Sequence, residues 1–177
     1  MSGENRIAKI NRMHTEELMA THFGPLSITM LNDTPLSYVW RVSFLANFFT
    51  GPIYRTLTER YQLSRPEFVI LFSLSQRSGL VARDISLVTG LPKNSISRAV
   101  SDLLAKGLIH RNTDAADKRA KPLTLTATGK KILAATLPLF IERQEAMLAA
   151  LSEQERKSLY GLLEKLVYAM PNWVNPD

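Results

Sequence analysis

Residues 63–127 contain three helix-length segments followed by two short alternating segments, and this order constrains the fold more than any other feature. Ser64 and Glu67 have the spacing of a capping box that opens the first helix. Gly90 and Gly107 are placed to end the second and third helices. Apolar residues of the third helix recur at spacings of three and four, which places them on one face: Ile96, Ala99, Val100, Leu103 and Leu104.

The segments 108–111 and 122–126 alternate with a period of two, which predicts the strands of a β-hairpin. Between them lies the run NTDAADKRAK, whose ten residues are polar, basic and too many for a tight turn. Three helices followed by such a hairpin indicate a winged helix-turn-helix, whose third helix enters the major groove of DNA. The expected fold class is therefore mainly α with a small β-hairpin (α+β), including a helical dimerisation region.

The positive charge is concentrated in this part of the chain. Residues 77–131 hold eleven lysines and arginines against four aspartates, whereas the whole chain carries a formal charge of only +6. A basic block in an otherwise nearly neutral chain is typical of a surface that meets phosphate. Charge alone leaves two alternatives open, an anionic membrane surface and a solvated face without a partner.

The flanking segments predict the remaining organisation. Residues 1–33 form an N-terminal arm, with a weak helical pattern that ends at Gly24 and Pro25. Thr34 and Pro35 resemble an N-cap and a first helical residue, so a helix is expected to start there. This dimerisation helix covers 34–62, with a kink or break expected at Gly51 and Pro52. The DNA-binding domain covers 63–127, C-terminal helices completing the dimerisation region cover 128–171, and a tail covers 172–177.

Several classes of protein are disfavoured by what the sequence lacks. It has no cysteine, which excludes a disulfide scaffold, and three poorly spaced histidines, so no metal or cofactor is expected. No run approaches a membrane span or the apolar core of a signal peptide, so a cytoplasmic location without membrane contact is expected. The sequence contains no nucleophile elbow, no phosphate-binding glycine loop and no carboxylate pair, so an enzyme is not expected.

The run from Leu63 to Lys130 resembles the MarR family of bacterial transcriptional regulators. The resemblance rests on LSRPEFVIL, on NSISRAVSDLLAKGLIHR, on DKR in the wing and on the closing LTLTATGK. The resemblance extends in outline from about Pro35 to Met170, because the long helix before this run and the two after it match the family's dimerisation elements. It implies a DNA-binding regulator, most commonly a repressor.

The resemblance also assigns residues. The positions that read DNA bases in this family are Lys93, Asn94, Ser95, Ser97 and Arg98. The Asp-x-Arg pattern of the wing falls on Asp117 and Arg119, where the acid holds the wing's shape and the arginine reaches the minor groove. Four further cations are expected to lie against backbone phosphates: Lys118, Lys121, Arg111 and Arg83. Val81 departs from the pattern, because a Ser or Thr cap is natural before the second helix of this domain.

The helix 34–62 and the leucine-rich terminal helix carry more apolar surface than one small lobe can bury, which predicts a two-fold homodimer on a pseudo-palindromic operator. The resemblance implies a small effector, an aromatic acid, its thioester or a related anion, that lowers DNA affinity. The effector site is expected to have an aromatic wall with one cation. The same side chains fit the core of a dimer interface better, because aromatic residues dominate interfaces generally. The candidate residues are Tyr38, Trp40, Arg41 and Phe44.

One alternative function remains open at the level of the sequence. A winged-helix domain can also serve as an architectural factor or a protein-interaction module without a small-molecule switch. Sequence-specific binding separates the two, because an architectural protein has little preference for any one site.

Overall fold

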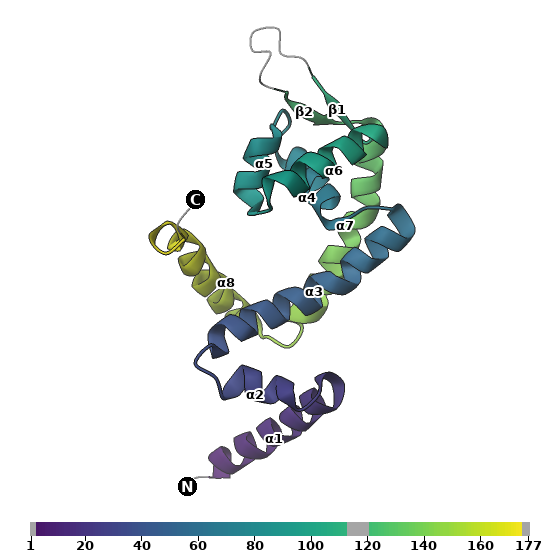
Figure 1. The fold of residues 1–177 in the computed structure, drawn as a ribbon. Coiled ribbons are helices and arrows are strands. Elements are labelled where there is room, and N and C mark those ends of the chain that lie inside the picture. Colours follow the sequence, from purple (N-terminus) through teal and green to yellow (C-terminus); the bar gives the residue numbers. More distant parts are fainter. Residues whose placement is uncertain (1–2, 113–120, 175–177) are drawn as a thin grey trace. The chain divides into compact units, whose positions relative to one another are not determined.

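Eight α-helices, a two-stranded sheet and a short 3-10 helix follow one another along the described part of the chain (Figure 1). The computed structural model describes residues 3–112 and 121–174, with the backbone alone for residues 3–12. The elements are α1 (Gly3–Phe23), α2 (Leu26–Asn32), α3 (Ser37–Tyr61), α4 (Arg65–Gln76), α5 (Ala82–Thr89), α6 (Lys93–Ala105), β1 (Ile109–Arg111), β2 (Leu123–Leu125), α7 (Ala127–Leu148), α8 (Glu153–Tyr168) and η1 (Met170–Asn172).

The chain divides into two compact units, one of residues 1–51 and one of residues 52–177. In the first unit, α1 and α2 pack against each other. Phe23 at the end of α1 lies edge-on to Phe44 and Phe48 of α3, with ring centroids 5.2 and 4.7 Å away. The N-terminal segment is therefore a helical hairpin, whereas the sequence indicated only a weak helical pattern.

Helix α3 begins at Ser37, two residues later than the expected start at Pro35. The expectation was wrong because the Thr34 hydroxyl donates to the Met30 carbonyl of α2, 3.1 Å away, and so belongs to the preceding helix end. Of the kink or break expected at Gly51 and Pro52, the break is absent, since α3 continues through Pro52. Ile53 and Leu57 are buried immediately after the proline, and this packing offsets the intrahelical hydrogen bond that proline removes.

The core of the second unit lies between α4, α6 and the hairpin (Figure 1). Its fully buried side chains come from several helices and both strands: Leu57, Leu63, Ile70, Leu71, Ile85, Ile96, Val100, Leu103, Ile109, Leu123 and Thr136. Strands β1 and β2 are antiparallel, with Ile109 opposite Leu125 and Arg111 opposite Leu123. The mainly α fold with a small hairpin is thus the predicted class.

Local signals in the sequence explain most helix ends. The Ser64 backbone N–H donates to Glu67 Oε2 at 2.7 Å, and the Ser152 N–H donates to Glu155 Oε2 at 2.8 Å, as in a capping box. Gly90 ends α5 in the left-handed conformation, with φ of 66°. The capping box predicted at Ser64 and the helix end predicted at Gly90 are confirmed.

Aromatic rings join α3, α4 and α7. Phe68 of α4 stacks on Phe140 of α7 at 4.3 Å, and Tyr54 of α3 lies edge-on to Phe140 at 6.0 Å. The Arg65 guanidinium sits 5.7 Å from the centre of the Tyr54 ring. Burial raises the pKa of the Tyr54 hydroxyl, and the Arg65 charge opposes that shift. The long helices are thereby attached to the first helix of the winged domain.

Candidate nucleic-acid interface

Helix α6 has one buried and one exposed face, as the sequence predicted. Ile96, Ala99, Val100 and Leu103 are all buried against the core. The opposite side chains are exposed, and they present amide, hydroxyl and cationic groups: Lys93, Asn94, Ser97, Arg98 and Ser101. Ser95 is half-buried. The exposed set can offer hydrogen bonds to base edges or phosphates from one rigid helix.

The turn between α5 and α6 is held by side-chain hydrogen bonds. The Ser86 hydroxyl donates to the Leu91 carbonyl at 2.7 Å, and the Leu91 N–H donates to the Thr89 hydroxyl at 3.4 Å. Gly90 supplies the positive φ that the turn requires. These bonds set the direction in which α6 leaves the turn, as a helix-turn-helix requires.

The hairpin has more backbone pairing than its two strands alone. Gly79 N–H donates to the Leu123 carbonyl at 2.9 Å, and Leu123 N–H donates to the Leu80 carbonyl at 3.0 Å. The segment between α4 and α5 therefore covers the second edge of β2. On the other side, Asn112 N–H donates to Pro122 at 2.8 Å and extends the pairing beyond β1.

The predicted phosphate contacts lie at several places on this unit. Arg83 in the first turn of α5, Arg111 at the end of β1 and Lys121 just before β2 are all exposed. Val81 precedes α5 without a side-chain capping bond, as its residue type implied. Three predicted wing residues, Asp117, Lys118 and Arg119, lie outside the described residues.

An ion pair that sequence reasoning missed attaches the far end of α6. Lys106 Nζ, at the C-cap, donates to Glu67 Oε1 at 2.5 Å and to the Gln62 carbonyl at 2.6 Å. Glu67 was recognised only as a helix cap, because the capping box is a local pattern. Lys106 is 39 residues away along the chain, and no spacing rule connects the two.

The four predicted effector residues lie on α3, in different surroundings. The Arg41 guanidinium donates to the Leu31 carbonyl and to Asn32 Oδ1, so it holds the C-terminal end of α2. Tyr38 is 85 % exposed, and Phe44 is packed with aromatic rings of its own unit. Arg41 does line a hollow of about 370 Å³, with residues of α1 and α2: Thr15, Glu16, Met19, Ile28, Leu31 and Asn32.

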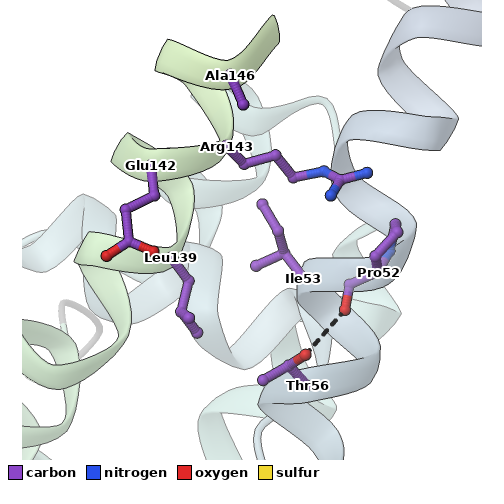
Figure 2. A pocket seen from close by; sticks show the side chains of 7 residues that line it. All are labelled: Pro52, Ile53, Thr56, Leu139, Glu142, Arg143 and Ala146. Atoms are coloured by element: carbon purple, nitrogen blue, oxygen red, sulfur yellow. Dashed lines mark hydrogen bonds between the residues drawn. The ribbon is translucent and has the colours of Figure 1, made fainter.

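A second hollow, of about 330 Å³, lies between α3 and α7 within residues 52–177 (Figure 2). Pro52, Ile53 and Thr56 form the α3 side, where the Thr56 hydroxyl donates to the Pro52 carbonyl at 3.2 Å. Arg143 extends from α7 toward Pro52, and Glu142 points the other way (Figure 2). Both hollows are near the lower end of the range for small-molecule sites.

Two structural features, a metal-binding cluster and a membrane-spanning helix, are absent from the described residues. No group of three or more histidine, aspartate or glutamate side chains there is arranged to hold a metal ion. No helix in the same part of the chain is long and apolar enough to cross a membrane.

The helix-turn-helix, the hairpin and the exposed polar face of α6 define a winged helix-turn-helix protein. The family model described as "MarR family" matches residues 61–120. The transcriptional regulator HosA of Escherichia coli O157:H7 is 28% identical over 120 residues, which cover 65% of this chain and 89% of HosA. The chain belongs to the MarR family, and it is a transcriptional regulator and not an enzyme.

Solved structures agree with this assignment. A MarR/EmrR family regulator from Acinetobacter sp. ADP1 superimposes with a TM-score of 0.68 at 28% identity, covering 76% of this chain and 95% of that one. The MepR–DNA complex of S. aureus superimposes with a TM-score of 0.66 at 24% identity, covering 76% and 97%. This second likeness concerns the fold alone.

Proposed function

We propose that the protein is a sequence-specific repressor that binds a pseudo-palindromic operator through α6 and is released by a small effector. The observation that carries the proposal is the two-faced α6, whose exposed side is polar and cationic along its first turns. A helix of this kind fits the major groove, where side chains read base edges.

The proposed DNA-binding residues divide into base readers and phosphate contacts. Lys93, Asn94, Ser95, Ser97 and Arg98 are the proposed base readers, and the Arg98 guanidinium can make a bidentate contact with guanine. Arg83, Arg111 and Lys121 are exposed around the same helix and suit backbone phosphates. In the wing, Lys118 and Arg119 contact DNA and Asp117 organises the loop by the family's pattern.

We also propose that the regulator is a homodimer. Helix α8 carries a row of exposed apolar side chains, and none of its residues is buried in the described chain. Such a surface on an amphipathic helix marks a protein interface. In this proposal, residues 34–62 and 128–171 form the dimerisation region, 63–127 bind DNA, 1–33 are an arm and 172–177 a tail. Two recognition helices then meet half-sites about 34 Å apart.

The proposed effector is a small aromatic acid, its acyl thioester or a related anion. Each of the two hollows on α3 includes one arginine, Arg41 or Arg143, which suits a carboxylate. Arg41 is held by carbonyls of its own unit, and the aromatic residues Tyr38, Trp40 and Phe44 do not line its hollow. Arg41→Ala and Arg143→Ala therefore distinguish the two places by loss of effector response.

Footprinting on DNA upstream of the protein's own gene tests the proposed function. The salt concentration is about 0.15 M, so that non-specific phosphate binding is weak. A protected two-fold-symmetric site supports the proposal. Diffuse protection, even with distant genomic fragments added, supports the alternative, an architectural or protein-interaction module without a switch.

A further inference from the structure

One buried carboxylate joins the ends of three helices. Glu67 is 3% exposed. Its Oε2 accepts hydrogen bonds from the Ser64 N–H and hydroxyl, at 2.7 and 2.8 Å, at the start of α4. Its Oε1 accepts from Lys106 Nζ at the C-cap of α6, and Lys106 Nζ also donates to the Gln62 carbonyl after α3. We call this arrangement the Glu67 node, formed by Glu67, Lys106 and Gln62.

Stability alone is a weak reason for such a node. Removing charge from water costs free energy, and apolar side chains of similar size often stabilise a core equally well. What a buried ion pair adds is a defined geometry, because it forms only when both partners and their hydrogen bonds are in place. The Glu67 node therefore specifies how the ends of α3, α4 and α6 meet.

The backbone at Gln62 supports this reading independently. Gln62 has φ of 51° and is the one non-glycine residue with a positive φ in the part of the chain that the structure describes. Left-handed backbone is unfavourable for a residue with a side chain, so the surrounding structure must hold it. The carbonyl of this constrained residue is the second acceptor of Lys106.

The node lies at the end of α6 opposite the proposed base readers. Helix α6 has 13 residues, so its two ends are about 20 Å apart at 1.5 Å per residue. A tilt of about 5° around the node would move the first turn by nearly 2 Å, by the same arithmetic. Hydrogen bonds to base edges tolerate only a few tenths of an ångström.

We infer that Lys106 and Glu67 are positioning residues for operator recognition: through the Gln62 carbonyl they couple the end of α3 to the angle at which α6 meets the bases. The inference rests on the proposed function. It assigns Lys106 a role other than phosphate contact, although Lys106 belongs to the basic block and its side chain is 35% exposed.

The test compares operator DNA with a scrambled duplex of equal length by fluorescence anisotropy. Wild-type protein comes first, since failure to distinguish the duplexes contradicts the proposed function itself rather than the node. Lys106→Met should weaken operator binding about tenfold while binding to scrambled DNA stays within about twofold, because only base contacts depend on the angle of α6. Lys157→Met is the matched control, because Lys157 is exposed on α8 and loses the same charge.

Salt dependence and two further variants separate the node from simpler roles. Equal losses on both duplexes, with a salt slope smaller by about one, would make Lys106 a phosphate contact and overturn the inference. Lys106→Arg keeps a cation and should retain the preference for the operator. Glu67→Gln with Lys106→Met removes both charges, so no ion is left unpaired; it should recover thermal stability but not the preference. Recovery of both would show a purely structural role.

Discussion

The backbone of Gly129, in the first turn of α7, lies directly against the carbonyl of Leu108, just before β1. A Cβ at Gly129 would clash with the Leu108 oxygen and lie 3.1 Å from the carbonyl carbon. The Gly129 N–H donates to the Thr126 hydroxyl at 2.9 Å, and the Thr126 N–H donates to the same Leu108 carbonyl at 3.1 Å. The start of α7 is therefore fixed to the base of the hairpin.

Gly129→Ala should destabilise the protein. The added methyl group forces α7 away from Leu108, and overpacking of this kind costs about 1–3 kcal/mol. For a chain of this size each kcal/mol lowers the melting temperature by roughly 2–4 °C, measured by circular dichroism. Gly161→Ala is the control, because a Cβ there meets nothing within 4 Å and alanine favours a helix. A Gly129→Ala protein as stable as wild type would contradict the close approach.

Gln62→Gly should stabilise the protein by about 1 kcal/mol. Glycine adopts the left-handed conformation of residue 62 without the steric cost that a side chain brings. The substitution keeps the backbone carbonyl that accepts from Lys106. Urea unfolding measures the change in the free energy of unfolding, and a loss of stability would show that the Gln62 side chain contributes more than its backbone strain costs.

Ser152→Ala should raise the pKa of Glu155. Hydrogen bonds from Ser152 hold this pKa below the ordinary value of 4.5, because they favour the charged carboxylate. The resulting stabilisation is present above the ordinary pKa and is lost as the pH falls through the lowered one. A carboxyl-carbon NMR titration measures the shift. Ser158→Ala is the control, because Ser158 donates instead to the Gln154 carbonyl, and it should leave the Glu155 titration unchanged.

Leu166→Glu should dissociate the proposed dimer. Leu166 is exposed on α8, in the row of apolar side chains assigned to the interface. A carboxylate buried there has no partner, so dimer affinity should fall at least about tenfold. Sedimentation at micromolar concentration distinguishes dimer from monomer. Lys157→Glu changes charge elsewhere on the same helix and should leave the mass unchanged; a wild-type monomer would exclude the dimer.

Arg98→Ala and Lys121→Ala should have different effects on DNA binding. Loss of a base contact at Arg98 should cost about 1–3 kcal/mol on the operator and relax specificity at one position. Loss of a phosphate contact at Lys121 should weaken binding to all sequences and reduce the salt slope by about one. Anisotropy titrations on matched and mismatched duplexes measure both. If the two variants changed specificity and salt dependence in the same way, the division into base readers and phosphate contacts would be contradicted.

Local signals in the sequence determined much of this protein. Capping boxes at Ser64 and Ser152, the glycine ends of α5 and α6, and the two faces of α6 all depend on residues within one or two helical turns. Interactions between residues close together in the sequence determine where a helix begins and ends and which of its faces is apolar. These features can therefore be predicted without a structure. The fold class followed from these signals, whereas the family and the candidate base readers came from the resemblance of the run from Leu63 to Lys130 to MarR regulators.

The tertiary structure decided what distant residues do to one another. Thr34 was predicted to cap α3, but its hydroxyl donates a hydrogen bond to the Met30 carbonyl of α2. Arg41 is a predicted effector ligand, and folding also places its guanidinium on the Leu31 carbonyl at the end of α2. Lys106 looked like one more cation of a basic block, yet it binds Glu67 across 39 residues. Each side chain had several possible partners along the chain, and only folding brought one of them within hydrogen-bond distance.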